Sequence, residues 1–238
     1  MDTLRDFHLG EGAVQELFMD MDIDHINNHG EGTSAQYKMR YLIDDSAVQG
    51  AINPPILFYC GNEGDVITFY NNSGFVTKTL PPQVNGLVLF GEHRYYGKSM
   101  PFGNQSFTAD NVKFLTVDQA MLDYVNLIKM IKASNVNYTN SPVIAFGGSY
   151  GGMLAAWMRM KYPFIIQGAH AASAPILFFN GVTSPYAFND LATRDFAAID
   201  PKCPQLIRQG FSVLDRLGKD ATNYKMIHDI FNLCPATI

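Results

Sequence analysis

The stretch PVIAFGGSYGGMLAAWMRMKYP, residues 142–163, constrains the fold of this chain more than any other. A short apolar run leads into four glycines around one serine and one tyrosine, and a helix-like run follows. Because glycine lowers the stability of strands and helices alike, its clustering here indicates a backbone geometry that side chains would obstruct. Gly147 to Gly151 have the form G-x-S-x-G, directly after a predicted strand and before a predicted helix. This context predicts a nucleophile elbow with Ser149 at its apex.

The elbow geometry explains the glycines. To raise a serine hydroxyl above the end of a sheet, the chain must reverse within a few residues, which strains the serine backbone. Side chains at Gly147 and Gly151 would collide, and Gly152 lets the helix pack close to the sheet. The alternative is a phosphate-binding turn, but no Lys-Ser or Lys-Thr follows and no third glycine lies at the dinucleotide spacing. The pattern favours a nucleophile.

An oxyanion hole is expected beside this serine. Ser149 would lie at the N-terminus of the following helix, where free N–H groups and the helix dipole favour developing negative charge. The N–H of Tyr150 would be one arm of the hole, and the second is expected from the loop after an earlier strand. That loop exists as GNEGD, residues 61–65.

The rest of the chain reads as an α/β fold with a mostly parallel sheet. Four apolar runs suit strands buried on both faces: residues 48–60, 86–90, 142–146 and 164–173. QYKMRYLI, residues 36–43, alternates more and predicts an edge or antiparallel strand. Residues 116–134 predict a helix with one apolar stripe and a capping box from Thr116 to Gln119. We therefore expect a core over 1–178 and, in the polar helix-like segment 179–238, the beginning of a helical cap.

The composition limits the kinds of partner that this chain is expected to bind. The chain has 238 residues, a net charge of −5 and no Lys/Arg-rich run, which argues against nucleic acid. No window approaches the roughly 18 apolar residues of a membrane span, and the acidic N-terminus lacks the apolar region of a secretory signal. Nothing in the sequence points to a cofactor or a metal.

Sequons and cysteines bear on the compartment. Cys60 lies in an apolar run and is expected to be a buried thiol, whereas Cys203 and Cys234 flank a helical stretch and could pair with each other or with other cysteines. Three N-x-[ST] sequons in polar, turn-like settings are candidate glycosylation sites: Asn71, Asn104 and Asn137.

Several long motifs, in order, resemble the proline-specific serine exopeptidases, the family of Pro-X carboxypeptidase and dipeptidyl peptidase II. They are FYCGNEGD, GEHRYYGKSMPFG, GGSYGGMLAAWMRMKYP and GAHAASAPI, and the resemblance runs from about residue 22 through DPKCPQLI. It implies an α/β-hydrolase core, a helical cap, a Ser–Asp–His triad and cleavage beside proline in lysosomes or secretory vesicles. The family's signal peptide is not found in this chain, and its triad Asp and His lie after the cap. His170 and His228, which follow Ser149, are expected to be structural.

The resemblance also implies roles for individual residues. Ser149 is the expected nucleophile, and Tyr150 and Asn62 are expected to form the oxyanion hole. Candidates for substrate binding are Glu63, Asp65 and His93. His93 lies between Glu92 and Arg94, and these three residues form either a positioning cluster or a structural ion pair.

The expected activity is that of a serine exopeptidase that acts on proline-containing peptides through an acyl-enzyme. The segment SPYAFNDLATRDFAAIDPKCPQLI, residues 184–207, resembles the dipeptidyl peptidase branch more, because it lacks an additional cysteine of the carboxypeptidase branch. It therefore favours release of N-terminal X-Pro dipeptides, with Pro-X carboxypeptidase activity as the alternative. Because the triad partners are missing, the chain alone is expected to be nearly inactive. A lipase or thioesterase on the same fold, and an inert pseudoenzyme that binds peptides, remain the rival readings. The sequence leaves open whether a homodimer forms.

Overall fold

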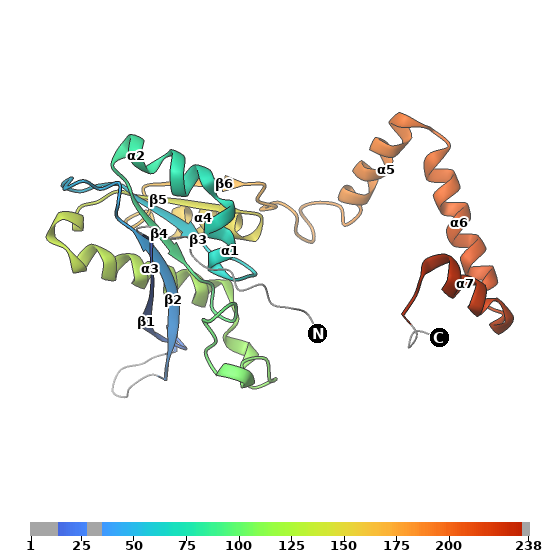
Figure 1. Cartoon of the computed structure of the whole chain (residues 1–238), viewed down its shortest axis with the longest axis horizontal. Coiled ribbons are helices and arrows are strands. Elements are labelled where there is room, and N and C mark those ends of the chain that lie inside the picture. The colour runs from blue at the N-terminus through green and yellow to red at the C-terminus, as the bar shows by residue number, and fades with distance from the viewer. Residues whose placement is uncertain (1–13, 28–34, 235–238) are drawn as a thin grey trace. The chain divides into compact units, whose positions relative to one another are not determined.

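The computed structural model describes residues 14–27 and 35–234, which form two compact units divided between Ile176 and Leu177. The first unit contains a six-stranded sheet with the order β1-β2-β4-β3-β5-β6 (Figure 1). Its strands are β1 (Gln15–Asp22), β2 (Gln36–Asp44), β3 (Ile56–Cys60), β4 (Leu87–Gly91), β5 (Val143–Gly148) and β6 (Gly168–Ala172).

Strands β4, β3, β5 and β6 run parallel to one another, and β1 and β2 are antiparallel additions at one side. The expected α/β fold with a mostly parallel sheet is therefore confirmed. Since the carboxyl ends of parallel strands meet at one edge, the loops after β3, β4 and β5 converge there.

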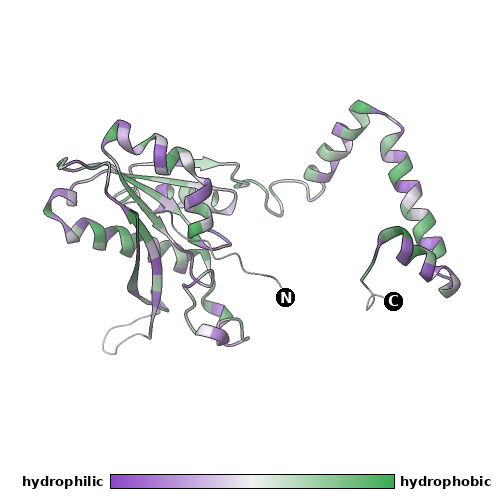
Figure 2. Ribbon diagram, in the orientation of Figure 1, coloured by the Kyte–Doolittle hydropathy of each residue, from purple (hydrophilic) through white to green (hydrophobic). Residues whose placement is uncertain are grey.

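Helices cover both faces of this sheet. On one face lie α3 (Val117–Ser134) and α4 (Tyr150–Lys161), against alternate strand residues such as Phe58 and Leu89. On the other lie α1 (Val66–Asn72), the π-helical turn η1 (Phe75–Thr79) and α2 (Pro81–Val84), against Leu57 and Phe90. The apolar strands run through the centre of the unit (Figure 2). Short 3₁₀ turns lie in the connections: η2 (Gly103–Gln105), η3 (Val112–Phe114) and η4 (Val136–Tyr138).

Helix α3 has the predicted apolar stripe, and its members are buried: Ala120, Met121, Tyr124, Leu127, Ile128 and Ile131. The Thr116 hydroxyl caps the helix by accepting from the Gln119 N–H. The second hydrogen bond of the predicted capping box, from the Thr116 N–H to the Gln119 side chain, does not form. The Gln119 side chain instead bonds Asp24 and the His25 N–H. The helix start is thus tied to the segment after β1.

Two expectations for strands need correction, and one strand was not predicted. The run 164–173 is not a strand buried on both faces: Ile165 and Ile166 are buried in a turn, and the strand itself is the largely exposed β6. The run 48–60 is a strand only from Ile56 onward. The expectation of an edge or antiparallel strand over residues 36–43 is confirmed, because β2 is antiparallel to β4, and the unpredicted β1 pairs along its outer side.

The second unit is helical over its described residues. It contains α5 (Ala187–Ile199), α6 (Cys203–Leu217), the 3₁₀ turn η5 (Ala221–Asn223) and α7 (Tyr224–Phe231), and no strand follows β6 in the described part of the chain. These helices are amphipathic, with polar and apolar faces (Figure 2). Cys203 and Cys234 are separate free thiols, and Cys60 is a buried thiol, as expected. Over residues 14–27 and 35–234, the helices are too short or too polar to span a bilayer.

Candidate active site

Ser149 forms a sharp turn between β5 and α4, with φ 55° and ψ −125°. A positive φ is strained for a residue with a side chain, and such strain is typical of functional turns. The turn is held by the Ser149 N–H, which donates to the Ala172 carbonyl at 2.9 Å, and by the Ser149 carbonyl, which accepts from Met153 N at 3.0 Å. Ser149 itself is exposed. The chain therefore has the elbow conformation that its sequence predicts.

The neighbouring glycines are required by close backbone approaches, as the sequence indicates. A Cβ atom at Gly147 would lie 2.8 Å from Gly152 N and closer still to the Gly151 carbonyl. A Cβ at Gly151 would lie 2.7 Å from the Cys60 carbonyl oxygen, and one at Gly152 would lie 2.9 Å from the Ala172 oxygen. The first contact closes the turn, the second lets α4 approach the end of β3, and the third lets α4 approach β6.

The loop after β3 lies against the first turn of α4. A Cβ at Gly151 would be 3.3 Å from Asn62 Oδ1, which places the Asn62 side chain beside that turn. This Oδ1 is buried and has no hydrogen-bond partner among the described residues. Gly61 is bonded on both sides: its N–H donates to the Gly91 carbonyl at 3.0 Å, and its carbonyl accepts from the Tyr124 hydroxyl at 2.6 Å.

The two acidic residues of this loop differ. Glu63 is exposed, and its charge acts on Tyr96, Tyr150 and His93, so it faces the elbow. Asp65 instead caps α1: one carboxylate oxygen accepts from Ile67 N at 2.8 Å and the other pairs with Arg40 at 2.5 Å. Glu63 thus acts on the charge state of Tyr150, the residue after Ser149, whereas the carboxylate of Asp65 is bonded to α1 and to Arg40.

His93 links the loop after β4 to the elbow. It is only 1% exposed, its Nδ1 lies 2.6 Å from the Arg94 carbonyl oxygen, and its Nε2 lies 3.0 Å from the Tyr150 hydroxyl. A carbonyl can only accept, so Nδ1 carries the proton and Nε2 accepts from Tyr150. Burial lowers the pKa of His93, which favours this neutral ring. With both ring nitrogens bonded, His93 holds the Tyr150 side chain.

Glu92 and Arg94 do not pair with each other. Glu92 pairs with the buried Arg40 of β2 and also accepts from Val66 N and Ser99 Oγ. Arg94 pairs with the buried Asp123 of α3 through contacts of 2.6 and 2.8 Å. Two separate buried ion pairs therefore flank His93 and fix the loop that carries it.

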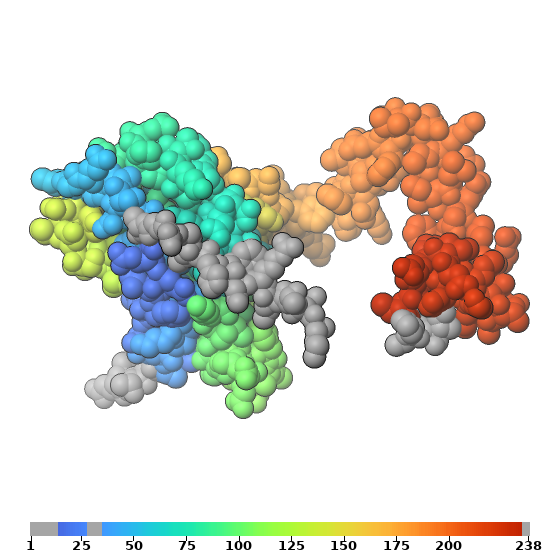
Figure 3. Space-filling view, in the orientation of Figure 1, coloured from blue at the N-terminus to red at the C-terminus, as the bar shows by residue number. Residues whose placement is uncertain are grey.

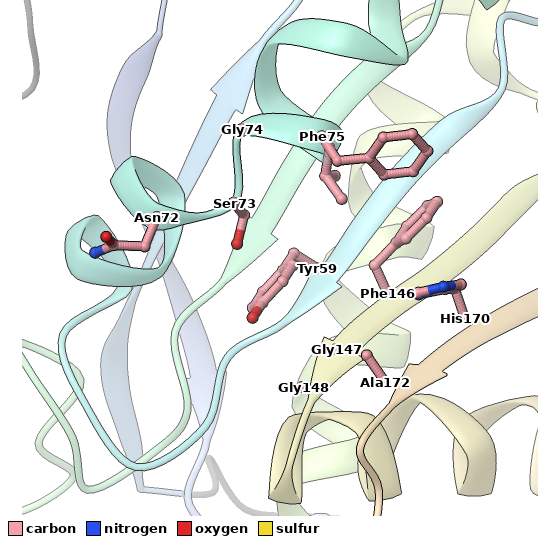
Figure 4. Close-up of a pocket in the computed structure, with 11 residues that line it drawn as sticks. Tyr59, Asn72, Ser73, Gly74, Phe75, Phe146, Gly147, Gly148, His170 and Ala172 are labelled. Atoms are coloured by element: carbon pink, nitrogen blue, oxygen red, sulfur yellow. The ribbon is translucent and has the colours of Figure 1, made fainter.

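The two histidines after Ser149 lie in different settings. His170 is exposed on β6 and lies beside Phe146 of β5, with ring centroids 5.9 Å apart. Both face a cavity of about 250 Å³ that Tyr59, Ser73 and neighbouring residues also line (Figure 4). His228 belongs to α7, and its Nδ1 lies 3.3 Å from the adjacent Asp229 carboxylate. In the described part of the chain, no side chain bonds the Ser149 hydroxyl.

The candidate glycosylation sites lie in one short helix and two 3₁₀ turns. Asn71 is exposed but lies in the last turn of α1, so the turn-like setting expected there is wrong. Asn104 is exposed in η2, within the green segment at the surface in Figure 3, and Asn137 is half-buried in η4. Among residues 14–27 and 35–234, no group of three or more His, Cys, Asp or Glu side chains could hold a metal.

Sequence reasoning missed Tyr124, Arg40 and Asp123, which hold the loops around the elbow. Tyr124 was one more apolar position of a helix stripe, and nothing local marks its hydroxyl as a partner of Gly61. For Arg40 and Asp123, the sequence offered one signal: a charged residue among the core positions of a strand or helix must be paired when it is buried.

The α/β fold and the strained turn at Ser149 are typical of α/β hydrolases, and comparison with known proteins gives the family. The model of the family "Serine carboxypeptidase S28" matches residues 22–237, and the chain belongs to this family of serine peptidases with an α/β-hydrolase core. It is 41% identical over 219 residues to the lysosomal Pro-X carboxypeptidase of Mus musculus, covering 92% of this chain and 44% of that protein. Prolyl carboxy peptidase like protein 5 of Caenorhabditis elegans is 40% identical over 205 residues, covering 84% and 39%.

Solved structures also resemble the chain at low identity. The peroxisomal alpha-beta-hydrolase Lpx1 of Saccharomyces cerevisiae aligns with a TM-score of 0.48 and 11% identity, covering 73% of this chain and 48% of that chain. A carboxyl esterase from Bacillus coagulans aligns with a TM-score of 0.43 and 15% identity, covering 66% and 43%. The chain spans less than half the length of the curated relatives it matches.

Proposed function

We propose that Ser149 is the nucleophile of a serine exopeptidase that cleaves peptides beside proline. The single observation that supports this most is the exposed Ser149 at a positive φ between β5 and α4. A hydroxyl in this position can attack a peptide carbonyl, and the first N–H groups of α4 have no intrahelical partner and can stabilise the resulting oxyanion. The Tyr150 N–H supplies one arm of that hole, and the Asn62 N–H supplies the other.

Of the two exopeptidase activities, carboxypeptidase and dipeptidyl peptidase, we favour the first, which removes a C-terminal residue that follows proline. The sequence alone leans toward release of N-terminal X-Pro dipeptides, but the mammalian relatives that are 40–41% identical to the chain are lysosomal Pro-X carboxypeptidases. Dipeptide release is the second candidate for this site. We place the protein in the lysosome, as the names of these relatives suggest, with secretory vesicles as the alternative and with glycans at the exposed Asn71 and Asn104.

We propose further that the 238-residue chain by itself is a poor catalyst. No described side chain bonds the Ser149 hydroxyl, and His93, whose ring lies close to Tyr150, has both ring nitrogens occupied. Loss of the base and its orienting acid costs about 10⁴-fold or more in such enzymes. A peptide-binding protein without catalysis is the rival that this observation favours.

The test separates these possibilities. The chain alone, and the chain fused to the part of the mouse relative beyond the matched region, are incubated with a peptide ending in Pro-Phe and with an Ala-Pro-coumarin amide. We expect slow or no turnover by the chain, release of phenylalanine by the fusion, and no turnover by the Ser149→Ala fusion. Release of coumarin alone would establish the dipeptidyl activity. Turnover unaffected by Ser149→Ala would refute the proposed nucleophile.

A further inference from the structure

The buried hydroxyl of Tyr124 contacts the backbone of the loop that faces the elbow. Tyr124 lies on α3 with no exposed surface, and its hydroxyl donates to the Gly61 carbonyl at 2.6 Å. Its ring packs on the backbone of β4, where a Cβ at Gly91 would lie 3.0 Å from it, and its edge meets Phe58 at 5.4 Å between centroids. The hydroxyl is therefore held in one place by three elements of the core.

The contact fixes the direction of the next amide. The Gly61 carbonyl and the Asn62 N–H belong to one planar peptide unit, and the described residues contain no cis peptide. In a trans peptide these two groups point to opposite sides. Because Tyr124 holds the carbonyl on the side of α3, the Asn62 N–H points away from α3. The Gly61 N–H, bonded to the Gly91 carbonyl, prevents the loop from rotating about this anchor.

The Asn62 N–H is left free for a ligand. In the described part of the chain it donates to no other residue, and the Asn62 side chain lies beside the first turn of α4. A preorganised donor at the end of a helix that begins with an exposed serine is what an oxyanion requires.

We propose that Tyr124 is a positioning residue, which orients the Asn62 N–H toward the oxyanion that forms when Ser149 attacks. This inference rests on the proposed nucleophilic role of Ser149. Tyr124 touches no reacting atom and acts through the Gly61–Asn62 peptide. Removing one oxyanion donor costs about 10²–10³ in kcat in a serine protease. Tyr124→Phe keeps the Asn62 N–H but no longer fixes its orientation, so we expect about a 10-fold to 100-fold loss of Ser149 reactivity.

The matched control is Tyr95→Phe. Tyr95 is 1% exposed and its hydroxyl also donates to a backbone carbonyl, that of Asn111, at 2.5 Å. Both variants therefore remove one hydroxyl from a buried tyrosine and one bond to a carbonyl, with similar cost in stability. Replacing Tyr124 with p-aminophenylalanine keeps the ring and a hydrogen-bond donor, so it serves as the rescue variant. If Tyr124→Phe does not fold, the Asn62 resonance and the Ser149 reactivity are measured on the p-aminophenylalanine variant instead.

The experiment measures two properties of the 238-residue chain. The first is the ¹H–¹⁵N resonance of the Asn62 amide, which we expect to shift or broaden in Tyr124→Phe and to stay in place in Tyr95→Phe. The second is the rate at which a fluorophosphonate modifies Ser149, followed by peptide mass spectrometry over long incubation. We expect the rate to fall in Tyr124→Phe, to stay within about twofold in Tyr95→Phe and to recover in the p-aminophenylalanine variant.

The outcomes separate the two claims. An Asn62 amide that is unchanged in Tyr124→Phe overturns the positioning role, and so does an equal loss of reactivity in both phenylalanine variants. If wild-type Ser149 reacts neither in the chain nor in the fusion to the remaining part of the mouse relative, the proposed function fails. Whenever Ser149 does not react, the Asn62 resonance alone decides for or against the orientation by Tyr124.

Discussion

Gly147→Ala should destabilise the first unit far more than Gly148→Ala, although the two glycines are adjacent. The new Cβ at position 147 would lie 2.8 Å from Gly152 N and closer to the Gly151 carbonyl, and all of these are backbone atoms. At position 148 the nearest atom to the new Cβ is the Tyr59 hydroxyl, at 4.0 Å, and φ is not positive. The first substitution therefore requires movement of the elbow, and the second requires none.

The magnitude follows from the rigidity of the contacts. Overpacking of a core costs about 1–3 kcal/mol when side chains can adjust, and we place Gly147→Ala at about 3 kcal/mol because backbone must move. We expect Gly148→Ala to stay within about 1 kcal/mol of wild type, since alanine also restricts the unfolded chain. With a urea m-value of about 2–3 kcal/mol/M, the first loss lowers the midpoint by about 1–1.5 M.

The assay is urea unfolding followed by fluorescence of Trp157, the single tryptophan, which lies in α4 directly after the elbow. Its signal reports unfolding of the first unit, to which Trp157 belongs. Equal midpoints for the two alanine variants would refute the reasoning, because they would mean that the turn at Ser149 tolerates a side chain at position 147.

Three further outcomes follow from buried groups. Asp123→Ala leaves the buried Arg94 without its carboxylate and should cost about 3–5 kcal/mol in urea unfolding; a loss below 1 kcal/mol would show the pair to be dispensable. The folded-state pKa of His93 lies below its ordinary value of 6.5, so the unfolded chain binds the extra proton as pH falls below 6.5. Stability should therefore be full above that pH and decline below it, and this decline should be smaller in His93→Gln. Cys60 is buried and its pKa is raised by desolvation, so a thiol reagent should modify the two cysteines of the second unit in the native chain and Cys60 only after unfolding.

The elbow could be predicted from the sequence because its geometry is local. The chain reversal at Ser149, the contact of Gly147 with Gly151 and the approach of Gly152 to β6 involve residues close in sequence or one neighbouring strand. A short motif is therefore enough to predict most of the conformation of the elbow. The two buried parallel strands β3 and β4 were predictable for a similar reason, since a continuous apolar run suits a strand covered on both faces.

Elements at the sides of the sheet were harder to predict. β6 is built from small residues, and the larger apolar residues before it, Ile165 and Ile166, fill the core from a turn. An apolar run alone does not distinguish these cases. β1 was hidden by its acids, although Met19 and Met21 alternate with Asp20 and Asp22 as a half-buried strand requires, and Met21 is buried.

The partners that surround the site are distant in sequence, which is why local patterns could not reveal them. Tyr124 and Gly61 are 63 positions apart, and Arg40 and Glu92 are 52 apart. The motif GEHRYYG indicates that a charged cluster exists but not what each member contacts. In the structure, Glu92 pairs with β2 and Arg94 pairs with α3.

That division explains how the elbow can be rigid before any substrate binds. Glu92 is tied to β2 through Arg40, and Arg94 is tied to α3 through Asp123, so the loop between them has one conformation. A buried ion pair contributes little net stability after desolvation, but breaking it is costly, so these pairs select that conformation more than they stabilise the fold. His93 is then presented with Nδ1 bonded and Nε2 facing Tyr150. Tyr150, the residue after the proposed nucleophile Ser149, is thereby held by a chain of contacts that begins in β2 and α3.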